Sequence, residues 1–246
     1  MRQYKALIFD LCDTIIPYRN DRKPKVMIRG KEIHTTSPLL YDYFRTYRTD
    51  IPYLTFHDHF VSTTESVIAL RVSGKEVIAA DRFNLFLDRL EMHASDQRSA
   101  LHRQFLQIHF SQVANCLFCP KQNRELLITL KERYPIGLIT NFDDTDTVYS
   151  ILNREAIHAT FNSILISAEF GLRKPRKEIF LAACQSLKIS PSEALFIGDS
   201  FSSDIAGAKG VGMDAAWMNP DGASVKDGFP QPEYILSSLL DLKGIL

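Results

Sequence analysis

Lys5-Ala-Leu-Ile-Phe-Asp-Leu-Cys-Asp-Thr14 is the stretch of sequence that decides the fold. It begins with four apolar residues, Ala6 to Phe9, and such a run ahead of a polar cluster is typical of a strand buried in a parallel sheet. Asp10 then comes at the carboxyl end of this strand. Because open α/β sheets bind ligands past the carboxyl ends of their strands, this carboxylate can act as a nucleophile or hold a metal ion.

Length, charge and cysteine content narrow the class of protein. The 246 residues suit one large domain, or one domain with a second inserted into it. With 29 basic and 29 acidic residues, the chain has no net field to attract nucleic acid or an acidic membrane surface. No stretch approaches the ~20 apolar residues that span a bilayer, and the start leads directly into a strand and not a signal peptide. Since four cysteines make no disulfide framework, we expect a cytoplasmic protein without membrane or nucleic-acid partners, of open oligomeric state.

Strands and helices alternate from Pro120 to the end of the chain. Such alternation predicts a doubly wound parallel α/β sheet with right-handed crossovers. The strands are predicted at residues 136–139, 163–166, 194–197 and 215–218, with helices at residues 123–134, 144–155, 175–187 and 204–209 and a closing segment at 234–242. We therefore assign residues 1–16 and 120–246 to an α/β core domain.

Residues 17–119 are predicted to form an inserted, mainly helical domain. Helical periodicity begins at Ser37-Pro38 and returns at residues 56–70, 75–90 and 96–113. A β-hairpin is expected within residues 25–36, with Gly30 supplying the positive φ of its turn. The cations around this hairpin, such as Arg19 and Lys25, form either a flap that attracts an anion or a solvated face.

Cysteine and histidine pairs in this part of the chain resemble metal motifs only superficially. Cys116-x-x-Cys119 lacks the second pair that a zinc site needs, so we interpret these residues as ordinary buried thiols. His57-x-His59 has no supporting carboxylates or cysteines, which makes surface or interhelix histidines the better interpretation.

Polar residues recur where the predicted core strands end. Because these ends share one edge of a parallel sheet, five side chains should gather there: Asp10, Thr140, Lys174, Asp199 and Asp204. Carboxylates from different strands in an oxygen-rich setting suit Mg²⁺, which takes one or two carboxylates together with substrate phosphate. Lys174 would neutralise charge on a transferring phosphoryl group while Thr140 and nearby amides orient it. Taken singly, an aspartate placed as Asp204 is would more commonly be a helix N-cap.

Four motifs in order resemble those of the haloacid dehalogenase (HAD) superfamily of hydrolases. They are Phe-Asp-Leu-Cys-Asp-Thr at 9–14, Leu-Ile-Thr-Asn at 138–141, Lys174-Pro175, and Gly-Asp-Ser-x-x-x-Asp at 198–204. The resemblance implies a Rossmann-like core with a helical cap domain formed by the insertion. It also implies a nucleophile at Asp10, catalytic positions at Cys12, Thr140, Asn141 and Lys174, and Mg²⁺ held by Asp10, the Cys12 carbonyl and Asp199, with Asp204 close by. The expected substrate is a small, anionic, phosphorylated metabolite.

Cys12 departs from the pattern of the phosphatases that this chain resembles. Those enzymes carry a second aspartate here, which protonates the leaving group and later activates water. A free thiol is mostly protonated at neutral pH, so it could donate a proton but would be a poor base. Asp13 is adjacent, but successive side chains diverge and it should point elsewhere.

Three functions are compatible with these residues. The first is a Mg²⁺-dependent phosphatase working through an aspartyl-phosphate on Asp10, slow or selective for good leaving groups. The second is a hydrolase of carbon–halogen or carbon–phosphorus bonds, the latter requiring a Schiff-base lysine for which Lys75 is the candidate. The third is a phosphate-binding or regulatory protein with little turnover. Retention of Asp199 and Asp204 favours phosphorus chemistry over dehalogenation, and retention of the whole set favours an enzyme.

Overall fold

The computed structural model describes residues 3–225, 228 and 230–246. The chain divides into two compact units. The first, called the α/β unit below, contains Met1–Tyr18 and Phe118–Leu246. The second, called the inserted unit, is Arg19–Leu117.

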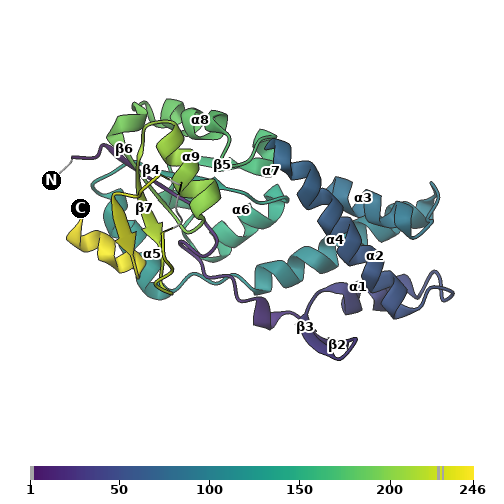
Figure 1. The fold of residues 1–246 in the computed structure, drawn as a ribbon. Helices are drawn as coiled ribbons and strands as arrows, with labels where there is room; N and C mark the ends of the chain where they lie inside the picture. The colour runs from purple at the N-terminus through teal and green to yellow at the C-terminus, as the bar shows by residue number, and fades with distance from the viewer. Residues whose placement is uncertain (1–2, 226–227, 229) are drawn as a thin grey trace. The chain divides into compact units, whose positions relative to one another are not determined.

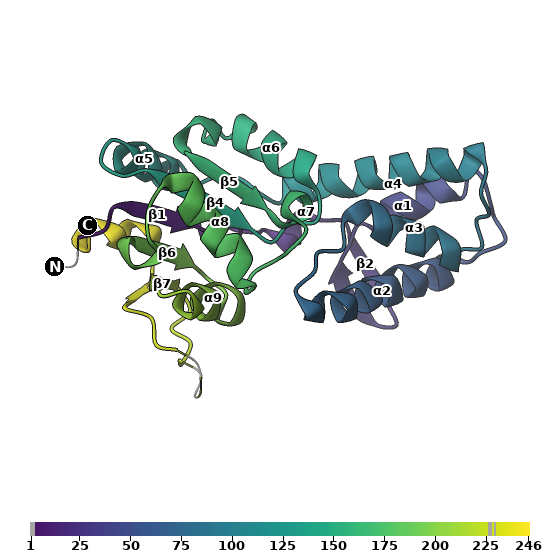
Figure 2. The same ribbon diagram turned by 90° about the horizontal axis from the view of Figure 1, so that it is seen from above.

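A sheet of six parallel strands forms the centre of the α/β unit (Figures 1 and 2). The strand order is β5-β4-β1-β6-β7-β8, so the two central strands, β1 and β6, are far apart in sequence. The strands are β1 (Ala6–Phe9), β4 (Ile136–Thr140), β5 (Ser163–Ile166), β6 (Ala194–Gly198), β7 (Asp214–Met218) and β8 (Tyr234–Leu236). The parallel α/β fold expected from the alternating pattern is therefore confirmed.

Helices cover both faces of this sheet, as Figures 1 and 2 show. One face carries α5 (Lys121–Lys131) and α6 (Thr145–Arg154), and the other carries α8 (Lys177–Leu187) and α9 (Ala206–Gly210). The shorter pieces are α7 (Ser167–Phe170), the 3₁₀ segments η3 (His158–Thr160), η4 (Pro191–Glu193) and η6 (Leu239–Gly244), and the π-helical turn η5 (Phe201–Ile205). With both faces covered, all four residues of β1 are buried, which explains its unbroken apolar run.

The core between the sheet and α8 shows why the strand ends are rigid. Ile179 and Phe180 of α8 pack in one cluster with Ala6 and Ile8 of β1 and Phe196 of β6. Each buried side chain of this size contributes about 1.5–3 kcal/mol relative to an exposed one. The strands that carry Asp10 and Asp199 at their ends are thus fixed by packing along their length.

The inserted unit has one hairpin and four helices. Strands β2 (Lys25–Ile28) and β3 (Lys31–His34) pair antiparallel across a turn in which Gly30 has φ of 77°. The helices are α1 (Ser37–Phe44), α2 (Tyr53–Leu70), α3 (Ala79–Arg89) and α4 (Asp96–Asn115), with single turns η1 (Asn20–Arg22) and η2 (Arg71–Ser73). Their shared core is aromatic and includes Phe44, Phe56, Phe83, Phe86 and Phe105.

Two histidines of the inserted unit are buried between its helices. His57 Nδ1 lies 2.8 Å from Ser37 Oγ, and His109 Nδ1 lies 2.8 Å from Thr36 Oγ1. Burial lowers the pKa of both imidazoles, so both are neutral at physiological pH. His57 and His109 thus form hydrogen bonds between segments of the inserted unit, which agrees with the interhelix positions expected from the sequence.

Several predicted helix starts differ from the structure, and two of the differences have a visible physical cause. The helix predicted at residues 75–90 begins only at Ala79, because Gly74 has a left-handed φ of 79° and the Glu76 carboxylate pairs with Arg71 at 2.8 Å. The helix predicted from Asp204 is preceded by a π-helical turn, η5, that begins at Phe201. Asp204 is therefore not a helix N-cap.

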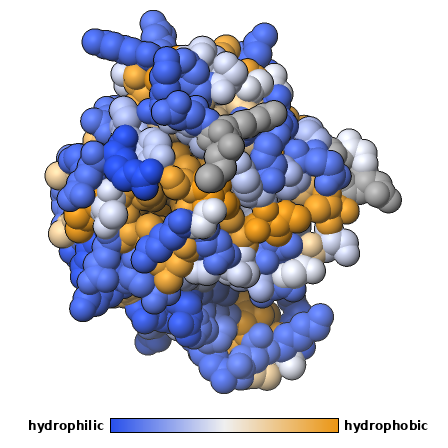
Figure 3. All heavy atoms as spheres, turned by 90° about the vertical axis from the view of Figure 1, so that its left-hand side faces the viewer, coloured by the Kyte–Doolittle hydropathy of each residue, from blue (hydrophilic) through white to orange (hydrophobic). Residues whose placement is uncertain are grey.

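The surface of the α/β unit is mostly polar. Figure 3 shows one face of it, where hydrophilic residues surround a narrow strip of hydrophobic atoms. Exposed apolar side chains in this unit include Phe118, Ile128, Leu181 and Ile235, and scattered exposure of this kind is ordinary for a folded domain. Among the described residues, no helix combines the length and apolarity that crossing a membrane requires.

Candidate active site

A cavity of about 220 Å³ lies past the carboxyl ends of β1, β4 and β6. Every site residue predicted from the sequence lines it: Asp10, Cys12, Thr140, Asn141, Lys174, Asp199 and Asp204. Parallel strands account for this convergence, because β4 and β6 flank β1 and all three point the same way. Asp10 is the first residue past β1, and its backbone N–H still donates to Ile197 O of β6 at 2.9 Å.

The loop after Asp10 turns the chain sharply. Asp13 has a left-handed φ of 57°, a conformation that aspartate tolerates better than most residues. One carboxylate oxygen of Asp13 accepts a hydrogen bond from the Tyr18 N–H at 2.8 Å. This bond holds the Asp13 carboxylate within its own loop.

Lys174 lies at the centre of the site. Its ammonium donates to Asp10 Oδ1 at 2.5 Å and to the Ile139 carbonyl at 2.8 Å, and Asp204 Oδ1 is 2.7 Å away. Although burial alone would lower the pKa of Lys174, the carboxylates of Asp10 and Asp204 raise it above its ordinary value. The ammonium therefore stays charged although Lys174 is only 3% exposed.

Asn141 holds the backbone of Lys174 in place. The Asn141 side chain donates to the Lys174 carbonyl at 3.0 Å and accepts from the Lys174 N–H at 2.8 Å. Both halves of the amide are thus used on one residue, which couples the end of β4 to the loop before α8. Thr140, 2% exposed, ends β4 with its side chain at the cavity wall.

The π-helical turn η5 brings Asp204 back beneath the end of β6. Its Oδ2 accepts the Ser200 N–H at 2.9 Å, while its backbone N–H donates to the Ser200 carbonyl at 2.8 Å. The carboxylate lies so close to Gly198 that a Cβ there would meet Asp204 atoms at 2.5 Å. A π turn at a functional position is a recurring feature of proteins.

Asp204 can occupy this position only because Gly198 has no side chain. Gly198→Ala is expected to displace Asp204 from Lys174 and to lower the free energy of unfolding by about 1–3 kcal/mol, as overpacking does. Gly210→Ala is the matched control, because a Cβ there meets nothing within 4 Å and Gly210 ends α9. Chemical denaturation of both variants checks this, and equal stabilities would contradict it.

The three carboxylates form a compact cluster of like charges. Single oxygens of Asp10, Asp199 and Asp204 lie within 4.8 Å of one another. Burial, with the charges of Asp204 and Asp199, raises the pKa of Asp10 to about 7 against the opposing effect of Lys174. Burial and Asp204 likewise raise the pKa of Asp199 to about 6. A divalent cation would relieve this repulsion, and an all-oxygen donor set suits Mg²⁺.

Cys12 also lines this cavity, and it is a free cysteine. Burial, followed by the charges of Asp10 and Asp13, raises the pKa of Cys12 well above its ordinary value. The group therefore stays protonated at neutral pH. It can offer a proton, but it cannot serve as a base for water.

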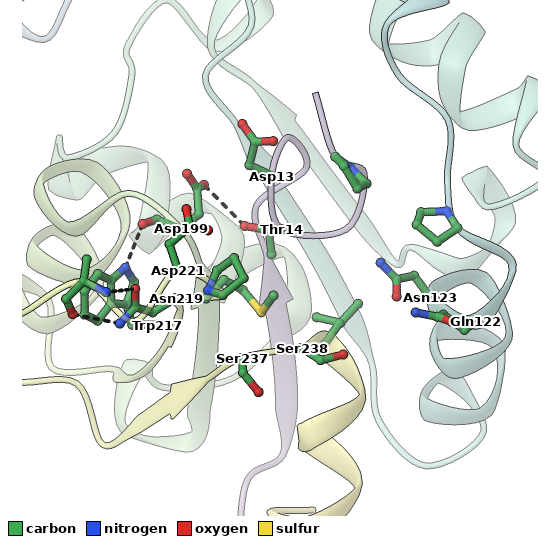
Figure 4. Close-up of a pocket in the computed structure, with 16 residues that line it drawn as sticks. Asp13, Thr14, Gln122, Asn123, Asp199, Trp217, Asn219, Asp221, Ser237 and Ser238 are labelled. Carbon is green, nitrogen blue, oxygen red and sulfur yellow. Dashed lines mark hydrogen bonds between the residues drawn. The ribbon is translucent and has the colours of Figure 1, made fainter. Parts of the chain in front are cut away.

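Two residues that sequence reasoning missed position Asp199. Trp217 Nε1 donates to the Asp199 carbonyl at 2.8 Å, and Thr14 Oγ1 donates to Asp199 Oδ1 at 3.4 Å (Figure 4). Thr14 stands within the first motif, so its position hinted at a role. Trp217 carried no signal, because a lone tryptophan in a buried strand is commonly a packing residue.

Comparisons with known proteins identify the family of this chain. A family model described as haloacid dehalogenase-like hydrolase matches residues 4–212. The HAD-hydrolase YfnB of Bacillus subtilis is 26% identical over all of this chain and 97% of its own length. A glyceraldehyde 3-phosphate phosphatase of Pyrococcus furiosus is 36% identical, but over 40% of this chain and 41% of its own.

Solved structures show the same fold. A 2-haloacid dehalogenase of Pseudomonas syringae superposes with a TM-score of 0.77 at 23% identity, covering 99% of this chain and 98% of its own. The YfnB structure, described as bound to magnesium, gives a TM-score of 0.65 at 22% identity over 100% of this chain and 99% of its own. Phosphatases and dehalogenases thus both occur among the similar proteins. The chain, with the motifs of this family gathered around one cavity, belongs to the haloacid dehalogenase-like hydrolases.

Proposed function

We propose that this hydrolase cleaves phosphate monoesters of small metabolites with Mg²⁺, through a phosphorylated Asp10. The observation that carries the proposal is the contact of a buried carboxylate, Asp10, with a buried ammonium, Lys174, inside a cluster of two further carboxylates. A nucleophile, a cation for phosphoryl oxygens and a donor set for a divalent ion are the parts that phosphoryl transfer requires. The similarity to proteins named phosphatases supports the substrate class.

In the first step, an oxygen of Asp10 bonds to phosphorus and the phosphorus–oxygen ester bond breaks. The bonding pair leaves on the alcohol oxygen, which takes a proton from the Cys12 thiol or from solvent. Lys174 offsets charge on the phosphoryl oxygens, and Thr140 at the end of β4 helps to orient the group. The carboxylates of Asp10 and Asp199 and the Cys12 carbonyl would hold Mg²⁺, which neutralises phosphoryl charge when bound.

In the second step, water bonds to phosphorus and the Asp10–phosphorus bond breaks, which returns the carboxylate and releases phosphate. The proton that the water loses passes to solvent, or back to Cys12 where its thiol gave up a proton in the first step. Because the pKa of Cys12 is raised, that thiolate rarely forms. We therefore expect slow hydrolysis, or substrates whose leaving groups need little protonation. Both oxygens of Asp204 are engaged, with Ser200 and Lys174, so its main role here is to position Lys174 beside the metal ligands.

The alternative reactions have less support from the structure. A buried carboxylate cluster is not needed for dehalogenation, which favours phosphorus chemistry. Phosphonate cleavage would need a Schiff-base lysine held against the substrate, but Lys75 is exposed in the loop after η2. Cys12 is the one observation that favours a phosphate-binding protein with little turnover.

A product screen separates these candidates. The wild-type chain is incubated with phosphomonoesters, phosphonates and 2-haloacids, with Mg²⁺ or with chelator, and phosphate or halide release is measured. Mg²⁺-dependent phosphate release from monoesters supports the proposal. Halide release that persists in chelator, or phosphate binding without any release, would overturn it in favour of the corresponding alternative.

Mg²⁺ affinity should rise with pH. Because the raised pKa values of Asp10 and Asp199, about 7 and about 6, leave protons on the cluster in mild acid, metal binding must displace those protons. We expect affinity to rise by about tenfold per pH unit near pH 5–6 for each proton displaced and to level off above about pH 7. Trp217, the single tryptophan of the chain, donates to the Asp199 carbonyl, so its fluorescence can follow the titration. A pH-independent affinity would contradict this assignment.

A further inference from the structure

A second and larger cavity, of about 560 Å³, lies in the α/β unit beside the catalytic one. The loop after β1, the start of α5 and the segments after β7 and β8 build it (Figure 4). Asp13 and Asp199 line both cavities. Its volume is far larger than a single ion or water needs, and falls within the range of small-molecule sites. The proposed phosphatase chemistry does not use this space.

Three hydrogen-bond donors in the wall of this cavity are already engaged inside the protein. Thr14 Oγ1 donates to Asp199, Ser237 Oγ donates to Asp241 Oδ2 at 2.9 Å, and the Trp217 indole donates to the Asp199 carbonyl. The hydroxyl groups of Thr14 and Ser237 keep lone pairs and can still accept. These two hydroxyl oxygens are therefore available to a donor group of a ligand.

Acceptors remain open in the same wall. Asn123 is 8% exposed, and its Nδ2 donates to the Ile15 carbonyl at 2.8 Å. Within the described part of the chain no hydrogen bond reaches its Oδ1, although Asn123 lines the cavity. Asp221 adds an exposed carboxylate, and Asp13 has one oxygen beyond the one that Tyr18 uses.

Charge in this cavity has one sign. Its described lining residues include the carboxylates of Asp13, Asp199 and Asp221 but no lysine, arginine or histidine. Phosphate would therefore be repelled here, in contrast to the catalytic cavity with its Lys174. Apolar wall is also present, from Trp217, Met218 and Leu239, which suits a carbon chain.

We propose that this second cavity binds a small aliphatic amine, either a diamine or a polyamine. An ammonium group has three donors and no acceptor, which complements a wall of carboxylate, amide and hydroxyl oxygens. The methylene chain between two such groups would cover the apolar wall. This is a ligand site separate from the proposed phosphatase site, although Asp13 and Asp199 border both.

Putrescine and spermidine are the probes for this site, with 1,4-butanediol as the uncharged counterpart of putrescine. Binding to the full chain in the presence of chelator is followed by Trp217 fluorescence and by calorimetry. Calorimetry detects binding even where the fluorescence of Trp217 does not change. We expect saturable one-to-one binding of the amines, and at least tenfold weaker binding of the diol. No binding of either amine, or equal binding of the diol, would overturn the proposal.

Charge variants locate the bound amine. Asp221 is exposed and lies outside the catalytic cavity, so its replacement should leave the fold intact. Asp221→Asn should weaken amine binding about 2–5-fold, the usual effect of one exposed charge pair, and Asp221→Lys about tenfold or more. Asp146→Lys is the matched control, because this exposed aspartate of α6 does not line the cavity. If the two lysine variants weaken amine binding equally, the attraction is nonspecific and the proposal is wrong. Because turnover is never measured, failure here and failure of the phosphatase proposal are distinguishable.

Discussion

Asp10→Asn is expected to abolish phosphate release, with turnover falling by at least roughly 10⁴-fold. The amide has nearly the shape of the carboxylate, but it cannot form the bond to phosphorus. Lys174 would also lose its ion pair at 2.5 Å, while its contacts with Asp204 and the Ile139 carbonyl remain. The measurement is phosphate release with the best monoester of the screen.

The control for this variant is the same chemical change at an uninvolved position. Asp146→Asn, on the exposed side of α6, should retain wild-type turnover. Acid-quenched wild-type enzyme should also yield a phosphorylated peptide that contains Asp10, and the Asp10→Asn variant should not. Turnover unaffected by Asp10→Asn would show that another group attacks phosphorus.

Cys12→Asp is expected to raise phosphatase turnover by about 10²–10⁴-fold, the usual contribution of general acid–base catalysis. The new carboxyl would enter the environment that raises the pKa of the Cys12 thiol, where burial and the charges of Asp10 and Asp13 favour protonated groups. It could therefore hold a proton for the leaving alcohol and, once ionised, accept one from water. The gain should be greatest for substrates with poor leaving groups.

Cys12→Asn separates proton transfer from shape. Asparagine has almost the size of aspartate but cannot exchange a proton in this role, so its turnover should not rise. If Cys12→Asn and Cys12→Asp accelerate hydrolysis equally, the benefit is steric and the assignment of an acid–base position is wrong. If neither variant nor the wild type turns over, although phosphate binds, the chain is a phosphate-binding protein.

Much of the fold was predictable from sequence because the sheet is parallel and covered on both faces. Buried strands then appear as short apolar runs, and their ends share one edge, so residues as distant as Asp10 and Asp199 could be placed together. Lys174 was placed in the same set although its loop before α8 carries no periodic signal, and one of the four family motifs contains it.

Local geometry at the site could not be predicted. The π turn that carries Asp204 depends on the missing side chain of Gly198, which is a tertiary contact between a strand and a turn. The bond from Trp217 to the Asp199 carbonyl depends on the pairing of β7 with β6. Similarly, α3 starts late because of the ion pair between Glu76 and Arg71. Periodicity describes what one segment favours and does not contain such partners.

The position of β1 has a consequence for how the protein is made. Ala6–Phe9 leaves the ribosome well before its two neighbours in the sheet, which begin at Ile136 and Ala194. This apolar segment therefore stays unpaired while the residues between it and its partner strands are synthesised. Contacts between segments so far apart in sequence also form slowly. A chain that stalls before β6 would expose this segment to aggregation and to chaperones. We expect nascent chains to gain protease resistance only after α9 has emerged.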